Sequence, residues 1–153
     1  MSSTTLQRPT ARAHTVPSHP ALRHHRSQVV RWALAHGHRI DRDTLAAIVA
    51  VRSDGTTGEL RRRWTADDVA RLVWSDVPLW CSSHGVPAPL DLATTLSTYL
   101  RYLSAHRLLE TGSDQVTVLR RAVSDQQPSQ RASRSRHPAL GGGSGPAPVL
   151  PIS

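Results

Sequence analysis

The stretch Trp64–Cys81, WTADDVARLVWSDVPLWC, constrains the fold of this chain more than any other segment. Thr65, with Asp68 three residues later, resembles a capping box, in which hydroxyl and carboxylate oxygens accept the first backbone N–H groups of a helix. The apolar residues that follow recur at helical spacing, which favours a helix with one buried face. These apolar residues are Val69, Leu72, Val73, Val77, Trp80 and Cys81.

Pro78 interrupts this pattern, because proline has no backbone N–H and its ring crowds the preceding turn of a helix. Either one helix kinks at this point, or a second helix begins near Asp76 with the proline in its first turn. We predict the second arrangement, with abutting helices over roughly 66–75 and 77–84 that end at Gly85.

Helical periodicity also predicts elements on both sides of this stretch. Ser27 and Asp41 are expected to cap two helices before it, and SDGTTGELRRR is expected to be a loop. Asp91 is expected to open the longest helix, and Ser113 or Asp114 a short last one. The residues expected to face the core are Val29, Val30, Ala33, Leu34, Leu45, Ile48, Val49, Leu92, Leu96, Tyr99, Leu100, Leu103, Val116, Leu119 and Val123.

The chain of 153 residues is long enough for one domain with a hydrophobic core. No segment shows the alternation typical of a strand, so we predict an all-α, compact bundle of about five or six short helices. Its predicted boundaries are residues 27–125. Residues 1–26 and 126–153 are rich in Ser, Pro and Arg and lack apolar periodicity, so they are expected to be disordered tails.

The net charge of +8 comes mainly from these tails. The middle of the chain, 27–125, has twelve arginines against eleven carboxylates, whereas the tails contain no acidic residue. All nineteen basic residues are arginine, a bias that a high-GC genome or selection for phosphate-binding forks could each produce. The tail arginines are Arg8, Arg12, Arg23, Arg26, Arg131, Arg134 and Arg136.

One cysteine excludes an intrachain disulfide, which favours a reducing compartment. The first twenty residues lack the apolar run of a signal peptide, and the longest apolar run, Leu45–Val51, is too short to cross a bilayer. We therefore expect a cytoplasmic protein without a membrane partner.

Nine histidines raise the question of a metal site. Cys81 and His84 have workable ligand spacing, and His36 and His38 form a second pair. A structural zinc site needs four nitrogen or sulfur ligands, normally as two tight pairs, and only one cysteine is present. His36, His84 and His106 each fall in the last turn of a predicted helix, where an imidazole interacts favourably with free carbonyls. We predict no metal site.

Catalytic motifs are also missing from the sequence. It has no nucleophile elbow, no HExxH and no P-loop lysine. Asp67 and Asp68 are interpreted as first-turn carboxylates at a positive helix end, and Cys81 as a small buried apolar residue. We predict a protein that is not an enzyme, with no catalytic residue and no cofactor.

The candidate nucleic-acid site is Arg61, Arg62 and Arg63 beside Trp64. Three arginines on a loop before a helix could contact phosphates, with the indole available for stacking on a base. Trp64 could instead pack on Val69. A shared face with Arg71, Arg120 and Arg121 would strengthen the prediction of DNA or RNA binding, and scattering would weaken it.

Two alternatives accompany this prediction. ALAHGHRIDRDTLAAIV resembles a helix-turn-helix, but an ordinary antiparallel helix pair fits better, because His36 and His38 flank the glycine where apolar residues usually pack. The near-neutral middle of the chain and its four tryptophans favour a protein-interaction module or homodimer as the alternative function.

Two family resemblances follow from these motifs. The pattern WT…DV..LVW.DVPLWC…HGVP.P, followed by YLRYL and GSDQVTVLR, is similar to short uncharacterised helical proteins of high-GC actinobacteria over about residues 28–125. WCSSHGVPAPLDLATTLSTYLRYL is similar to part of the N-terminal core-binding domain of tyrosine recombinases. That resemblance implies at most a DNA-clamping helical module, because the last tyrosine, Tyr102, leaves no room for a catalytic domain.

Overall fold

The computed structural model describes residues 19–135, with side chains described up to residue 127, and it confirms an all-α fold within that range. No strand occurs there; a single antiparallel bridge joins Ser53 and Leu60. The elements are α1 (Pro20–Ala35), α2 (Arg42–Val51), α3 (Ala66–Arg71), the π-helical segment η1 (Leu72–Asp76), α4 (Val77–Ser83), α5 (Leu92–Ala105) and α6 (Val116–Ser135).

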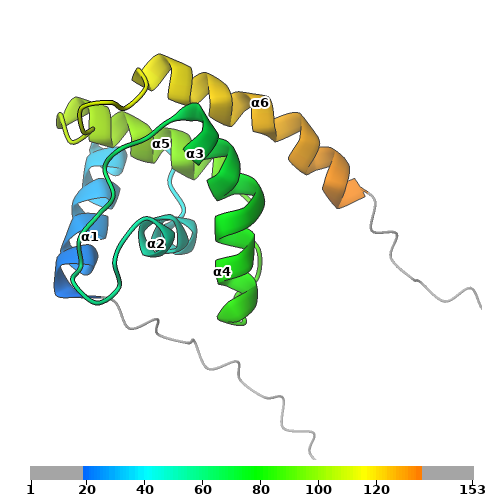
Figure 1. Ribbon diagram of the computed structural model, residues 1–153, viewed down its shortest axis with the longest axis horizontal. Coiled ribbons are helices and arrows are strands. Elements are labelled where there is room, and N and C mark those ends of the chain that lie inside the picture. Colours follow the sequence, from blue (N-terminus) through cyan, green and yellow to red (C-terminus); the bar gives the residue numbers. More distant parts are fainter. Residues whose placement is uncertain (1–18, 136–153) are drawn as a thin grey trace, which may run out of the picture.

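The helices are arranged around α2. Figure 1 shows α2 between α1 on one side and α3–α4 on the other, with α5 crossing beside all of them. α6 packs along α5 and against α3, and its C-terminal turns extend past the rest of the bundle. Among the described residues, none of the helices combines the length and the apolar composition that crossing a bilayer requires.

The core lies where α2, α3, η1 and α5 meet. Each fully buried aliphatic side chain stabilises such a core by about 1.5–3 kcal/mol relative to an exposed one. Most of the predicted inward residues are buried as expected, and Trp80 and Val116 are half-buried at its margin. The largest fully buried side chains are Trp64, Tyr99, Leu45, Ile48, Leu72, Leu96, Leu100, Leu103 and Leu119.

Two predicted helix starts are confirmed by their hydrogen bonds. The Asp41 carboxylate accepts the backbone N–H of Thr44 at 2.7 Å, which caps α2. At α3 the capping box is complete: the Thr65 hydroxyl accepts the N–H of Asp68, and the Asp68 carboxylate accepts the N–H of Thr65 at 3.0 Å. Both helix starts could be predicted from the sequence because each cap joins residues only three positions apart.

The join before Pro78 differs from the predicted one. α3, η1 and α4 form one continuous helical path, and the N–H of Val77 donates to the carbonyl of Leu72, five residues back. Asp76 makes no capping hydrogen bond. The wider π turn places the proline two residues into α4, where its missing N–H is tolerated. The predicted bounds of the two abutting helices and the place of Pro78 in the first turn of the second agree with the structure, but the two are joined without a break. The end at Gly85 is confirmed by its φ of 63°.

α1 begins at Pro20, seven residues before the predicted start at Ser27. Pro20 has the fixed φ of a first helical residue, and the His19 ring nitrogen Nδ1 accepts the N–H of Ala21 at 3.3 Å. The His19 ring also packs against Gly58, where any Cβ would collide with it. Histidine is an uncommon cap, so residues 20–26 were wrongly assigned to a disordered arm.

The last helix also exceeds its prediction. α6 runs for 20 residues to Ser135, so α5, with 14, is not the longest helix, and residues 126–135 are helical rather than part of a tail. The remainder of the two predicted tails, 1–18 and 136–153, lies outside the described residues.

Candidate functional site

The candidate loop Arg61–Trp64 has no regular secondary structure, and its backbone is hydrogen-bonded on both sides. The N–H of Arg61 donates to the carbonyl of Arg52 at 2.8 Å. On the other side, the N–H of Glu110 donates to the carbonyl of Arg62 at 3.1 Å, and that of Asp114 to the carbonyl of Trp64 at 2.8 Å. These bonds join the end of α2 to the connection between α5 and α6.

The three arginines of this loop do not share one surface. Arg61 and Arg63 line one surface hollow, whereas Arg62 lies near the other side of the segment, where its charge lowers the pKa of His25. The hollow of Arg61 and Arg63 also contains four acidic residues. They are Asp54, Glu59, Asp68 and Glu110.

Of the arginines proposed to share a face with this loop, Arg71 lies beside it but is paired with carboxylates, and Arg120 lies elsewhere. Arg71 lines the same hollow but is paired with Asp68 at 3.0 Å and with Asp76 at 3.5 Å. Arg120 of α6 donates from Nε to the hydroxyl of Ser97 at 3.4 Å. Because the positive charges are divided or neutralised, the triple-arginine loop does not form a continuous basic surface.

Trp64 is fully buried, with 0% of its surface exposed, so its indole is not available to stack on a base. The ring lies 4.3 Å from the Arg52 guanidinium carbon and 6.2 Å, edge to face, from the ring of Tyr99. Trp64 belongs to the same core cluster as Val69. The prediction that Trp64 stacks on a base is therefore wrong. Its indole packs in the core, which was the alternative interpretation of the sequence.

Arg52, the residue at the C-terminal end of α2, fixes the position of the Arg61–Trp64 loop. It is only 5% exposed, donates to the Asp68 carboxylate at 3.4 Å and also donates to the carbonyl of Arg63. Burial lowers the pKa of its guanidinium, and the nearby Asp68 carboxylate partly offsets this effect. Arg52 is thus a structural cation under Trp64, a role that its position after an apolar helix did not reveal.

A second cluster of arginines lies between α1 and α2. Arg23, Arg26 and Arg31 of α1 and Arg42 at the start of α2 line one hollow of about 610 Å³, called here the α1–α2 hollow. Asp43 is its only acidic lining residue. α1 itself contains no acidic residue at all. This cluster includes Arg23 and Arg26, two arginines that the sequence assigned to a basic arm.

Three of the four arginines in the α1–α2 hollow, Arg23, Arg31 and Arg42, have little compensating negative charge. No ion pair joins Arg23, Arg31 or Arg42 to a carboxylate among the side chains that the structure describes. Burial, and then the like charge of Arg23, lower the pKa of Arg26. The exposed guanidinium groups of Arg23, Arg31 and Arg42 therefore form a surface at which an anion would be stabilised.

The floor of the same hollow is apolar. It is formed by Val30, Leu34, Leu45 and Ala46. Leu34 was predicted to face the core, but 64% of its surface is exposed, so that prediction is wrong. It lies one residue after the buried Ala33 and lines the α1–α2 hollow, where most of its surface stays exposed.

On its inner side α1 contributes a buried histidine. His25 hydrogen-bonds through Nε2 to the Tyr99 hydroxyl at 3.1 Å and contacts the rings of Tyr99 and Tyr102 edge to face. Burial, then the charges of Arg62 and His24, lower the pKa of His25 to about 4. The imidazole is therefore neutral at pH 7 and serves as a polar core residue.

The histidines predicted at helix ends occupy those positions. His36, His84 and His106 are the C-cap residues of α1, α4 and α5. Nδ1 of His36 and of His84 each lies 2.8 Å from the carbonyl of the tryptophan four residues earlier. Within residues 19–135, no three His, Cys, Asp or Glu side chains converge as a metal site would require.

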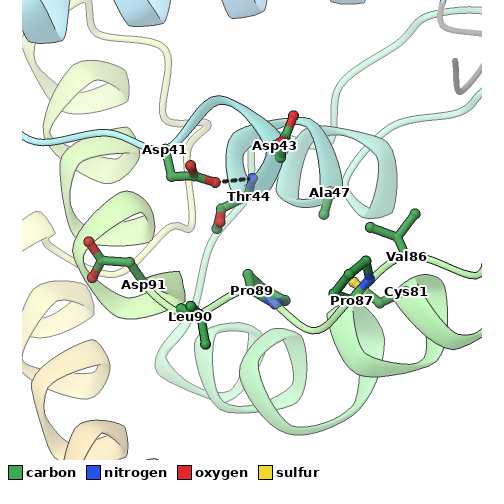
Figure 2. Close-up of a pocket in the computed structure, with 10 residues that line it drawn as sticks. All are labelled: Asp41, Asp43, Thr44, Ala47, Cys81, Val86, Pro87, Pro89, Leu90 and Asp91. Atoms are coloured by element: carbon green, nitrogen blue, oxygen red, sulfur yellow. Dashed lines mark hydrogen bonds between the residues drawn. The ribbon is translucent and has the colours of Figure 1, made fainter. Parts of the chain in front are cut away.

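A third hollow, of about 310 Å³, lies between the start of α2 and the connection 86–91 (Figure 2). It contains the carboxylates of Asp41, Asp43 and Asp91 beside the buried Cys81. Figure 2 shows the Asp41 carboxylate turned back onto the N–H of Thr44, where it caps α2. Asp43 lines both this acidic hollow and the α1–α2 hollow, so it marks the boundary between opposite charges.

Comparison with known proteins adds no relative. No protein-family model, curated protein or solved structure matches this chain. The two resemblances noted in the sequence are therefore unsupported, and the candidate function depends on the geometry described above.

Proposed function

We propose that this protein is a non-enzymatic binding module that contacts nucleic acid through the α1–α2 hollow. The observation that carries the proposal is the acid-free helix α1, whose arginines gather with Arg42 around a single surface hollow. Arg61, Arg62 and Arg63 play a secondary part in this account, because acidic residues surround two of them.

Phosphate recognition is the chemistry that fits these side chains. A guanidinium presents a planar fork of N–H donors that matches two phosphate oxygens. Arg23, Arg31 and Arg42 are exposed, so their forks can reach a ligand. Backbone phosphates of DNA or RNA provide several such partners at regular spacing, which a single bound anion does not.

Two properties of Cys81 support a non-catalytic function and a cytoplasmic location. Cys81, the only thiol, is buried, and burial raises the pKa of its thiol, so it is a poor nucleophile. A buried reduced cysteine is also compatible with a reducing compartment.

The proposal is tested by titrating the full chain against single-stranded and duplex DNA at several salt concentrations. Each phosphate contact contributes about 0.7 to the slope of log K against log salt for a single strand, so the three exposed arginines Arg23, Arg31 and Arg42 give a slope of about −2. Arg8 and Arg12 of the chain would make it steeper. No binding at low salt, or a slope near zero, would overturn the proposal.

A second candidate function is favoured by the apolar floor of the hollow. Exposed Leu34 between arginines suits an acidic, amphipathic helix from a partner protein, which would bury apolar residues and pair its carboxylates with Arg23 and Arg31. A second copy of this chain fits less well, because a two-fold interface would place two basic hollows against each other.

Leu34→Gln separates the two candidates. Phosphate contacts do not use the leucine, so DNA affinity should stay within about twofold of the unmodified chain. An acidic amphipathic peptide used as a probe should bind the unmodified chain and lose affinity about tenfold or more for Leu34→Gln. Peptide binding that shows this loss, together with no DNA binding, would select the second candidate.

A further inference from the structure

A ring-lined hollow lies on the other side of Arg31, between the C-terminal ends of α1 and α5. Its volume is about 520 Å³, within the range of small-ligand sites. Four of its lining side chains are planar rings from two different helices, and two others carry hydrogen-bonding groups. The six are Trp32, His36, Tyr102, His106, Gln28 and Arg31.

The rings hold one another in place. The centroid of the half-buried Trp32 indole lies 4.6 Å from that of His36 and 5.7 Å from that of Tyr102, which meets it at 74°. The ring of Tyr102 lies 4.4 Å from that of His106. Nδ1 of His36 is 2.8 Å from the carbonyl of Trp32, which fixes the imidazole. A planar guest would therefore meet a platform that is already ordered, at little entropic cost.

Arg31 links this platform to the basic surface, because it lines both the ring-lined hollow and the α1–α2 hollow. Gln28, one turn earlier on α1, contributes an exposed amide that can both donate and accept hydrogen bonds. Phosphate-binding and ring-binding groups thus lie next to each other along a single helix.

We infer that the ring-lined hollow receives a base of an unpaired nucleotide while the α1–α2 hollow holds the neighbouring phosphates. This rests on the proposed function, and it specifies single-stranded nucleic acid as the ligand class. Bases in a duplex are stacked on both faces and cannot enter a side hollow without being extruded, whereas single strands offer free ring faces. Stacking on aromatic side chains is the usual means by which proteins bind such strands.

The test compares two single strands of equal length, one with bases and one abasic, which carry the same phosphates. The full chain is expected to bind the strand with bases roughly tenfold or more tightly than the abasic strand. Trp32→Leu should remove this difference while leaving abasic affinity unchanged. Trp80→Leu is the matched control, because Trp80 is also half-buried and stacks on a C-cap histidine four residues later, His84, at 4.4 Å.

The outcomes separate the inference from the proposed function. Binding of both strands with equal affinity, unaffected by Trp32→Leu, would overturn the inference and leave the proposed function intact. No binding of either strand would overturn both. If circular dichroism shows that Trp32→Leu is unfolded, His106→Ala decides instead, because His106 is an exposed ring of the same hollow. It should weaken binding of the strand with bases several-fold without affecting the abasic strand.

Discussion

The Arg61–Arg63 loop and helix α1 each carry three arginines, yet they present them in opposite ways. In the loop the residues are consecutive, yet only Arg61 and Arg63 line the same hollow, and that hollow also contains four carboxylates. On α1 they are spaced over nine residues of an acid-free helix and gather in one hollow with a fourth arginine. A run of charge in the sequence is therefore a poor guide to a charged surface, because backbone geometry and neighbouring counter-charges decide it.

The buried Arg52 indicates that the Arg61–Arg63 loop has a structural role, because its guanidinium donates a hydrogen bond to the loop backbone. Arg52→Ala removes the donor to the Arg63 carbonyl and leaves Asp68 without its buried partner, so we expect a loss of about 3 kcal/mol in unfolding free energy. Chemical denaturation measures this. Arg61→Ala, at an exposed position, is the control and should change stability by no more than about 0.5 kcal/mol. A loss below about 1 kcal/mol for Arg52→Ala would contradict the anchoring role.

The inner side of α1 gives a pH-dependent prediction. The pKa of His25 is about 4 in the folded protein and 6.5 when the residue is unshifted, so between these values the unfolded chain binds more protons. Stability should be fully present above pH 6.5 and fall as the pH drops towards 4. The expected loss is on the order of 2 kcal/mol, since a tenfold change in proton affinity equals about 1.4 kcal/mol and partial solvent access reduces the total.

Denaturation curves across this pH range measure the effect, and His25→Gln should flatten the dependence. The carboxylates of Asp41, Asp54 and Asp68 have lowered pKa values, so they add stability that is present above their unshifted value of 3.8 and is lost as the pH falls through it. The part of the pH dependence between about pH 6.5 and 5 is therefore due to His25. A His25→Gln variant with the same slope as the unmodified chain would show that another group is responsible.

Helix α1 also contacts the connection that leads into the Arg61–Arg63 loop. The ring of its N-cap residue, His19, packs against Gly58 in that connection. Gly58 has a φ of 71°, and a methyl group there would meet the His19 ring. Gly58→Ala should therefore cost roughly 1–2 kcal/mol from backbone strain and loss of this contact. Gly55→Ala, where a Cβ meets no atom within 4 Å, is the control. Similar stability for both variants would argue against the contact.

The smallest expected effect concerns the one carboxylate of the α1–α2 hollow. Asp43→Asn removes a negative charge beside Arg42 without changing the shape of the side chain, so DNA should bind about two- to fivefold more tightly at low salt. The gain should disappear as salt rises. Asp67→Asn, in the first turn of α3, is a matched control with no expected effect on binding. Weaker DNA binding by Asp43→Asn would contradict the proposed surface.

Sequence reasoning succeeded where structure depends on neighbouring residues. The caps at Asp41 and Thr65 and the C-terminal positions of His36 and His84 are local, and all were predicted correctly. It failed where distant contacts decide. The start of α1 at Pro20 was missed, and the residue that caps it, His19, packs against Gly58, which lies 39 residues further along the chain.

The candidate site was predicted only in part, for the same reason. Packing of Trp64 on Val69 was a local alternative in the sequence, but its complete burial also depends on Arg52 and Tyr99, which lie 12 and 35 residues away in the chain. A sequence pattern that indicates the paired rings of the ring-lined hollow was overlooked. An aromatic residue precedes a C-cap histidine by four positions in Trp32–His36, Trp80–His84 and Tyr102–His106, a spacing that stacks the two rings.

The most direct test of the central claim compares two triple variants of the full chain, each lacking three arginines. Arg23, Arg31 and Arg42 are replaced by alanine in one, and Arg61, Arg62 and Arg63 in the other. Binding of a single strand is measured for both across about 50–200 mM salt. The account predicts that the first variant flattens the slope of log K against log salt by about 2, and the second by less than about 0.7. A larger change in the second variant than in the first would contradict it.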